Sequence, residues 1–163
     1  MPMTDDQLLE RMNAFVPPTA LMLGYRMLAL DSAKGWVRIR YEGKPEFCNP
    51  MGNLQGGIVA AMLDDAAATS AVVKAGERIV VPTLEFKTSF FAPARQGELF
   101  AEGRCLKLGK RAAFMEADLF DPDGKLLARM SCTAIPTPMP DNHSMVERKC
   151  CLLYTSPSPR DAT

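Results

Sequence analysis

The sequence predicts an α+β fold in which a curved antiparallel sheet wraps around one long central helix. Three observations favour this class. Residues 54–74 are rich in Ala, Val, Ile, Met and Leu and have the length and composition of a buried helix. Two β-like runs precede this segment, and four more follow it. Because a sheet with one apolar face must bury that face, the helix is expected to lie across it.

The first element is expected to be a short amphipathic helix at residues 4–15. Thr4 followed by Gln7 fits a capping box, in which each side chain bonds to the other residue's backbone N–H. The pair Pro17-Pro18 is expected to end this helix. Its apolar residues recur at helical spacing and form one stripe: Leu8, Leu9, Met12 and Phe15.

Six strands are predicted around the central helix. Residues 24–31 and 36–43 form a hairpin across the turn "DSAKG", and Val37, Ile39 and Tyr41 mark one face of its second strand. Strands joined by short turns pair antiparallel, so the four later runs are expected to form a meander. These runs cover residues 78–91, 98–108, 111–120 and 125–136.

Length, charge and cysteine content describe one domain, which we assign to residues 1–139. The chain has 163 residues, and its 19 basic residues balance its 19 acidic ones. This balance argues against a nucleic-acid partner. The sequence contains no run of about 18 apolar residues, so we expect no membrane-spanning helix. The N-terminus lacks a signal-peptide pattern, and the five cysteines form no C-x-x-C pair. We therefore expect a cytoplasmic protein with free thiols.

The last segment, residues 140–163, is expected to be disordered. It has no hydrophobic periodicity and ends in a stretch with Ser and Pro. Its final part, "CLLYTSPSPRDA", resembles the translation of sequencing-adapter read-through, and the alternative is a native disordered tail. In either case, the segment carries no functional information.

A single histidine limits the chemistry of the domain. His143 lies in the tail segment, outside the predicted fold. A Ser-His or Cys-His nucleophile needs an imidazole base, and zinc sites usually combine His and Cys ligands. We therefore expect no metal and no cofactor. Any catalysis must use carboxylates, amides, hydroxyls and backbone groups.

The segment "NPMGNLQGGIVAAMLDD", residues 49–65, combines polar groups with an apolar helix. Gly56 and Gly57 fall in the first turn, where free backbone N–H groups favour an oxygen that gains negative charge. Taken alone, the glycine pair would favour a different explanation, close packing of the helix against the sheet. Asp64 and Asp65 are harder to explain by packing, because they project about 100° apart among apolar neighbours. Burying a carboxylate there is costly unless it is paired or functional.

The spacing of Gly56 and Asp64 predicts a site shared between two chains. Eight residues of helix separate them by about 12 Å. A carboxylate that acts on a carbonyl held at Gly56 must come within about 3–3.5 Å of it. We therefore expect a symmetric dimer, in which two antiparallel central helices place Gly56 of one chain opposite Asp64 of the other.

Two stretches resemble the hotdog-fold acyl-CoA thioesterases of the phenylacetate-degradation PaaI type. They are residues 49–65 and the stretch "VPTLEFKTSFFAPARQGELFAEGRCLKLGKRAAFMEADLFDPDGKLLARMSCTAI". The resemblance covers about residues 15–136 and rests on the pattern N-x-x-G-x-x-H-G-G followed by an acidic residue. It implies a homodimer that often pairs into a tetramer. It also implies hydrolysis of acyl-CoA to free acid and CoA, with CoA as part of the substrate.

The resemblance also implies roles for individual residues. Asp64 matches the carboxylate that acts as nucleophile or general base, and Gly56 matches the backbone N–H that polarises the thioester carbonyl. Asn49 matches an amide that positions substrate or water. Thr83 matches a hydroxyl that assists hydrolysis in some members.

Gln55 departs from the family pattern, which has His at this position. Glutamine keeps a donor and an acceptor but cannot be protonated near neutral pH, so an orienting role is expected. The change favours hydrolysis over a dehydration that depends on histidine. The resemblance also implies that CoA contacts Gly57 and a basic turn that can meet its phosphates, formed by Gly109, Lys110 and Arg111.

The leading hypothesis is therefore an acyl-CoA thioesterase. The alternative is a non-catalytic acyl-CoA-binding or sensing protein of the same fold, which an appended DNA-binding module would favour. A purely structural role leaves the paired acids unexplained. Six apolar residues are candidates for an acyl pocket and equally for ordinary core: Met22, Met27, Phe47, Met51, Met62 and Phe90.

Overall fold

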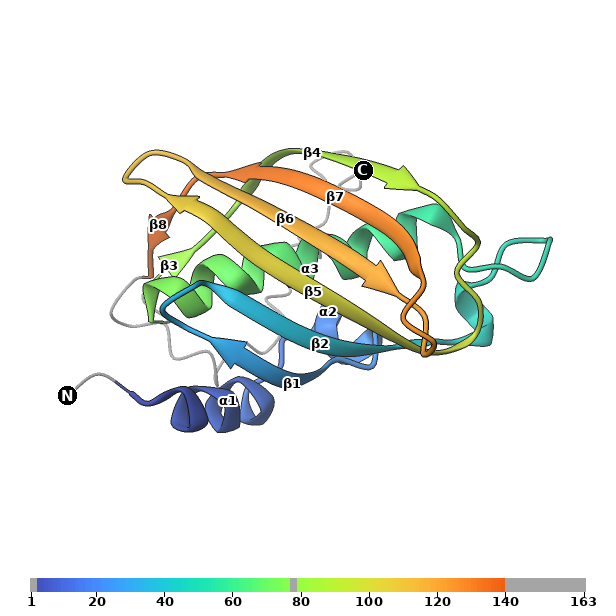
Figure 1. The fold of residues 1–163 in the computed structure, drawn as a ribbon, viewed down its shortest axis with the longest axis horizontal. Coiled ribbons are helices and arrows are strands. Elements are labelled where there is room, and N and C mark those ends of the chain that lie inside the picture. Colours follow the sequence, from blue (N-terminus) through green and yellow to red (C-terminus); the bar gives the residue numbers. More distant parts are fainter. Residues whose placement is uncertain (1–2, 77–78, 140–163) are drawn as a thin grey trace, which may run out of the picture.

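The computed structural model describes residues 3–76 and 79–139 of the chain. Two short helices come first, followed by a β-hairpin, the long helix α3 and the remaining strands (Figure 1). The elements, in chain order, are α1 Asp5–Ala14, α2 Pro18–Met22, β1 Arg26–Asp31, β2 Trp36–Gly43, η1 Pro45–Phe47, α3 Gly56–Ala75, β3 Ile79–Val80, β4 Thr83–Phe90, β5 Gly97–Leu108, β6 Ala113–Phe120, β7 Leu126–Ala134 and β8 Thr137–Pro138.

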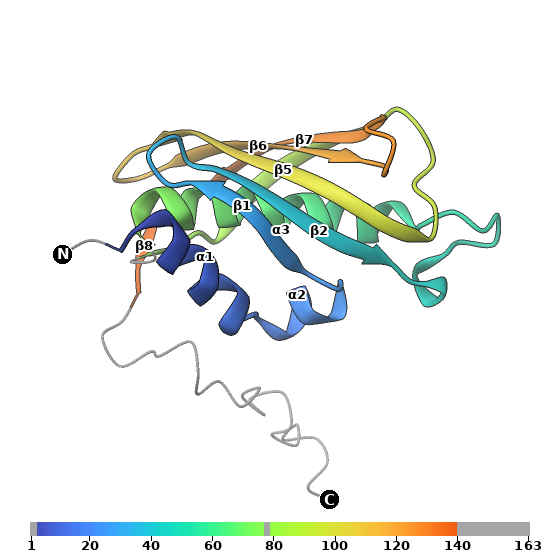
Figure 2. The ribbon, with the colours of Figure 1, turned by 60° about the horizontal axis from the view of Figure 1, so that its bottom comes forward.

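Six antiparallel strands form one sheet in the order β1-β2-β5-β6-β7-β4. Strands β3 and β8 form a separate two-stranded pair. Helix α3 runs along one face of the six-stranded sheet, which curves over it (Figure 2). The predicted α+β class, with an antiparallel sheet wrapped around a long central helix, is confirmed.

The four strand-like runs after α3 do not form a simple meander. Strands β5, β6 and β7 pair in sequence, but β4 pairs with β7 at the edge of the sheet, and β5 pairs with β2. The prediction of consecutive pairing was therefore wrong for β4. Residues 91–96 separate β4 from β5 and exceed the usual length of a tight hairpin loop, so this connection can cross between strands.

The N-terminal helix forms as predicted, and a second short helix follows it. Thr4 and Gln7 make both hydrogen bonds of the capping box. The carboxamide of Asn13 bonds to both backbone groups of Met27, at 2.9 Å each, and so ties α1 to β1. Helix α2 was not predicted, because the proline pair was interpreted only as a stop. Pro18 instead starts α2, since proline is well suited to the first helical position.

Small residues let α3 pack closely on the sheet. The helix begins at Gly56 and ends at Ala75, close to the predicted range 54–74. Gly76 ends it in the left-handed conformation, with φ of 71°. A side chain at Gly103 on β5 would collide with the backbone carbonyl of Ala66. This contact fixes the depth at which α3 lies and, with it, the position of the residues along its exposed side.

Strand β4 leaves apolar side chains exposed at an open edge of the sheet. Leu84, Phe86 and Phe90 are 60%, 48% and 54% exposed. Phe86 and Phe90 pair across from buried residues of β7, on the side of the sheet that faces α3. An exposed apolar edge of this kind is typical of a surface that meets another molecule.

By length and composition alone, α3 also meets the criteria for a helix that could span a membrane. Half of it is buried inside the domain, and the core helix of a folded domain meets the same criteria. Figure 2 shows α3 lying against the sheet along its whole length.

The predicted disordered tail, residues 140–163, lies outside the described residues. The domain boundary at residue 139 and the nature of the tail therefore stay predictions.

Candidate active site

The loop before α3 is held by backbone and amide hydrogen bonds. The Oδ1 atom of Asn49 accepts from the backbone N–H groups of Met51 and Asn53, at 2.9 and 3.3 Å. The backbone N–H of Leu54 donates to the carbonyl of Ala94 at 2.8 Å. These bonds fix the start of α3. They also occupy the carbonyl oxygen of the Asn49 side chain, so its amide nitrogen is the group that can donate to substrate or water.

The first turn of α3 offers two unused backbone donors. Among the described residues, the N–H groups of Gly56 and Gly57 have no hydrogen-bond acceptor, whereas Ile58 and Val59 donate to the carbonyl of Gln55. The side chain of Gln55 is exposed and makes no capping bond. Free N–H groups at the positive end of a helix dipole suit an oxygen on which negative charge develops.

Asp64 lies midway along α3, and one of its oxygens is already bonded. Thr83, at the start of β4, donates from Oγ1 to Oδ1 of Asp64 at 3.0 Å. The Sγ atom of Cys132 on β7 lies 3.8 Å from the same oxygen. Burial and the nearby charge of Asp64 raise the pKa of the Cys132 thiol to about 11, so the thiol keeps its proton. Within the described residues, Oδ2 of Asp64 has no hydrogen-bond partner.

Asp65, the next residue, bonds to the core instead. The hydroxyl of Tyr41, a buried residue of β2, donates to Oδ2 of Asp65 at 2.5 Å. Burial raises the pKa of Asp65 to about 6, and the charge of Asp64 adds to this rise, while the hydrogen bond from Tyr41 opposes it. The two adjacent acids therefore have separate environments.

An apolar groove runs along α3 and β4 and contains Asp64. Its volume is about 630 Å³. The Oγ1 atom of Thr88 is buried there without a hydrogen-bond partner among the described residues. Gly56 and Asp64 of one chain both line the groove, but eight residues of continuous helix hold them about 12 Å apart. The full lining is Gly56, Gly57, Ala60, Ala61, Asp64, Phe86, Thr88 and Phe90.

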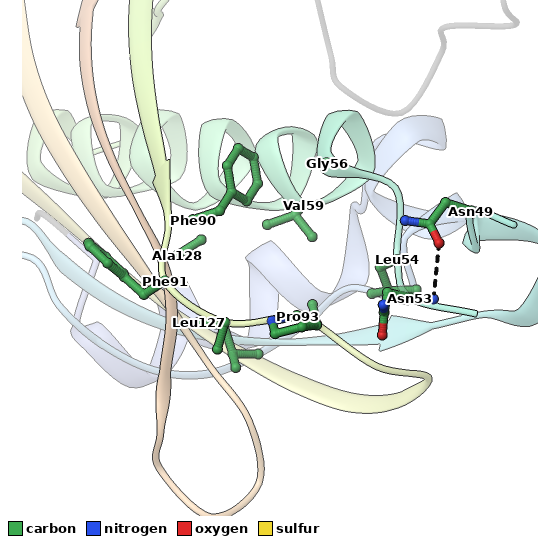
Figure 3. A pocket seen from close by; sticks show the side chains of 12 residues that line it. Asn49, Asn53, Leu54, Gly56, Val59, Phe90, Phe91, Pro93, Leu127 and Ala128 are labelled. Carbon is green, nitrogen blue, oxygen red and sulfur yellow. Dashed lines mark hydrogen bonds between the residues drawn. The ribbon is translucent and has the colours of Figure 1, made fainter. Parts of the chain in front are cut away.

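A cavity of about 380 Å³ lies beside this groove, at the start of α3 (Figure 3). Phe90 and Val59 project between β4 and α3 in this view, and Asn49 lies near the start of the helix. Gly56 and Phe90 line both the cavity and the groove. The other lining residues of the cavity are Asn49, Asn53, Leu54, Val59, Phe91, Ala92, Pro93, Ala94, Leu127 and Ala128.

Of the six apolar residues suggested for an acyl pocket, Phe90 alone lines these two spaces. The others belong to the core or to the surface. Met27, Phe47 and Met62 are buried, and Met22 and Met51 are exposed.

The basic turn suggested for CoA lies far from Gly56 of the same chain. Gly109, Lys110 and Arg111 connect β5 to β6, at the end of the domain where α3 finishes (Figure 1). Lys74, in the last turn of α3, donates to the carbonyl of Cys105 on β5 at 3.2 Å, which fixes this arrangement. The turn and Gly56 therefore lie at opposite ends of α3 (Figure 1).

Arg95 is a cation near the site that the sequence did not single out. It lies between β4 and β5, and its exposed side chain lines a surface pocket beside the loop that precedes α3. The sequence gives no signal that Arg95 lies near the site, because the loop between β4 and β5 meets the loop before α3 only in the folded domain. The other lining residues are Met51, Gly52, Asn53 and Gln96.

The contact between Tyr41 and Asp65 was also missed, although a signal for it exists. The alternation of Val37, Ile39 and Tyr41 places Tyr41 on the inward face of its strand, toward the predicted helix. Within residues 3–76 and 79–139, His, Cys, Asp and Glu side chains form no group of three or more that could hold a metal ion.

Comparison with known proteins identifies relatives of this chain. The sequence model of the thioesterase superfamily matches residues 51–128. A protein of Saccharolobus solfataricus named as an esterase is 30% identical over 107 residues, which are 66% of this chain and 74% of that protein.

Solved structures share the fold. A crystal structure from Ralstonia eutropha JMP134, named as a thioesterase related to phenylacetic acid degradation, is 32% identical. Its TM-score is 0.72, and the match covers 78% of this chain and 98% of that one. A Streptococcus mutans protein solved with bound acetyl CoA has a TM-score of 0.63 over 70% of this chain and 89% of its own. At 18% identity, this second likeness shows the fold alone.

Proposed function

This chain belongs to the thioesterase superfamily and is a thioester hydrolase, and we propose that it hydrolyses acyl-CoA to the free acid and CoA. One observation carries the proposal. Along one groove, α3 presents the unused N–H of Gly56 and the Asp64 carboxylate, which is bonded to Thr83 at 3.0 Å. A two-fold contact along this groove would place each of these groups opposite the other group of the partner chain. The Streptococcus mutans structure binds acetyl CoA, and its fold is similar to this one, which favours CoA as the carrier of the acyl group.

Asp64 supplies the reactive carboxylate. Its Oδ1 accepts from Thr83, and its Oδ2 is available. As a general base, Oδ2 takes a proton from water while the water oxygen bonds to the thioester carbon. The tetrahedral intermediate then expels the CoA thiolate, which recovers a proton, and the acid is released. As a nucleophile, Oδ2 instead bonds to that carbon and expels the thiolate, and water cleaves the resulting anhydride.

The start of α3 stabilises the negative charge of the intermediate. The free N–H of Gly56 points out of the first turn, where the helix dipole adds to its effect. Asn49 and Gln55 carry amide donors at the same end of the helix and orient the substrate or water.

Two chains complete the site. Gly56 and Asp64 of one chain are too far apart to act on the same carbonyl. The exposed apolar edge formed by Leu84, Phe86 and Phe90 suits a two-fold contact that brings Gly56 of one chain to Asp64 of its partner. The pairing of two dimers into a tetramer, and a cytoplasmic location, stay predictions.

A thiol-release assay tests the proposal with Asp64→Asn and a matched control. The asparagine side chain has the same size as aspartate and keeps an acceptor for Thr83, but it cannot act as a base. The kcat should therefore fall about 10²–10⁴-fold. The control Asp65→Asn changes the adjacent acid, which bonds to Tyr41 in the core, and should retain the activity. Unchanged turnover by Asp64→Asn would contradict the proposal. Wild-type protein that binds acyl-CoA but releases no thiol would favour the non-catalytic alternative instead.

A further inference from the structure

Phe90 separates the groove that contains Asp64 from the cavity at the start of α3. Both spaces are lined by Phe90 and by Gly56. A Cβ atom placed on Gly56 would lie 3.4 Å from Cζ of Phe90, so the ring rests against the first turn of the helix. The partition therefore stands at the point where the proposed reaction places the thioester carbonyl.

The remaining frame of the cavity is fixed by backbone hydrogen bonds. The N–H groups of Phe91 and Ala92 both donate to the carbonyl of Leu127, at 2.8 and 3.2 Å. The N–H of Leu54 donates to the carbonyl of Ala94 at 2.8 Å. The side chain of Phe90 forms the remaining wall, and it belongs to the edge proposed to meet the partner chain. The cavity thus combines a fixed backbone frame with one side-chain wall at the proposed subunit contact.

The lining of the cavity indicates which part of the substrate it accepts. Among the described residues, no charged side chain lines it, and its polar side chains are the amides of Asn49 and Asn53. An apolar chain would gain about fourfold in affinity for each buried methylene. The amide-containing arm of CoA would lose its hydration there, and a carboxylate would lack a cationic partner.

We propose that the cavity holds the acyl group, that the substrates carry compact uncharged acyl chains, and that Phe90 limits the length of these chains. This inference rests on the proposed function. With the carbonyl oxygen at the Gly56 N–H, the acyl chain enters the cavity beside Phe90, and the thioester sulfur points out of the cavity toward the partner chain. The volume of about 380 Å³ is at the lower end of the usual range for ligand pockets.

The test compares kcat/KM along a series of saturated acyl-CoAs, from acetyl to dodecanoyl, for the wild type, Phe90→Ala and Phe90→Leu. We expect Phe90→Ala to raise the ratio of kcat/KM between the longest and shortest substrates at least tenfold, with Phe90→Leu between it and the wild type. Phe114→Ala is the matched control, because Phe114 is 44% exposed and lies outside both spaces. Its ratio should stay within twofold of the wild-type ratio.

Three results would overturn the inference. They are an equal change of kcat/KM at every chain length in Phe90→Ala, an equal or larger shift in Phe86→Ala, which lines the groove but not the cavity, and a wild-type preference for succinyl-CoA over butyryl-CoA. If the wild type hydrolyses no acyl-CoA, the proposed function fails, and calorimetric titration with non-hydrolysable alkyl-CoA thioethers decides the inference. Affinity should then rise with chain length to a limit that Phe90→Ala moves to longer chains, and an unmoved limit would contradict it.

Discussion

The hydroxyl of Tyr41 donates a hydrogen bond of 2.5 Å to the carboxylate of Asp65, between β2 and α3. The adjacent Asp64 accepts instead from Thr83 on β4. Neighbouring positions on a helix point about 100° apart, so two acids that are consecutive in sequence reach different environments. One carboxylate belongs to the core and the other to the groove, and each can be changed without removing the other.

The stability of the protein should depend on the pH through Asp65. Burial raises the pKa of this carboxyl from 3.8 to about 6, against the opposing hydrogen bond from Tyr41. The folded state therefore holds the proton more tightly than the unfolded chain. The contribution of Asp65 to stability is fully present below pH 3.8 and is lost as the pH rises through about 6.

Urea unfolding of the wild type and Asp65→Asn across this pH range measures the effect. The free energy of unfolding of the wild type, relative to Asp65→Asn, should fall by about 3 kcal/mol between the two pKa values. Tyr41→Phe removes the opposing hydrogen bond and should extend the decline to higher pH. A difference between wild type and Asp65→Asn that does not change with pH would contradict this account.

Thr83 should affect the rate of acyl-CoA hydrolysis and not the stability of the fold. Its exposed hydroxyl donates to Asp64 at 3.0 Å, so Thr83→Val removes a bond to a charged group while retaining the shape of the side chain. The loss of a hydrogen bond to a charged group lowers the rate constant by about 10- to 100-fold. We expect kcat for acyl-CoA to fall by such a factor and the melting temperature to stay unchanged. Thr83→Ser keeps the hydroxyl and should keep the activity, and equal losses in both variants would exclude this role.

Arg95 should contribute to the binding of CoA phosphates. It is exposed beside the loop that precedes α3, at the same end of the helix as Gly56. Arg95→Ala should raise KM for acyl-CoA several-fold, and the increase should shrink at high salt because surface charges are screened. The matched substrate is an acyl-N-acetylcysteamine thioester, which lacks the phosphates. An equal rise in KM for this substrate would show that Arg95 acts in some other way.

The sequence predicts α3 and its first turn well because the signals for them are local. An apolar composition and a glycine pair need only neighbouring residues to be interpreted, and the helix begins at Gly56, within two residues of the expected start. The hairpin of β1 and β2 follows from alternation and one turn in the same way.

The pairing of β4 with β7 has no local signal. Turn lengths indicate which strands can be neighbours, but the arrangement of the whole sheet decides which strands actually pair. The cavity at the start of α3 depends on the same kind of information. It exists because the bond between Leu54 and Ala94 joins two loops that are 40 positions apart in the sequence.

Removal of a single N–H tests the oxyanion site at Gly56. Gly56 is the first helical residue, where proline is well tolerated, and Gln55 has the extended conformation (φ −59°, ψ 135°) that a residue before proline prefers. Gly56→Pro should therefore preserve the fold and lower kcat about 10²–10³-fold. Gly57→Ala places its Cβ in open space and should retain the fold as well as every backbone donor. Equal activity of Gly56→Pro and the wild type would exclude this N–H from the reaction.

Mixing two inactive variants then tests whether the site is shared between chains. A dimer of one Gly56→Pro chain and one Asp64→Asn chain contains one site with both defects and one site with neither, provided that each site takes Gly56 and Asp64 from different chains. An equimolar mixture of the two variants is mildly unfolded and refolded, so that chains exchange at random and half of the dimers are mixed. Each mixed dimer has one working site out of two, so about a quarter of the wild-type activity should return. If each chain carried a complete site, every chain in the mixture would keep one defect and no activity would return. The thiol-release rate before and after exchange separates these outcomes.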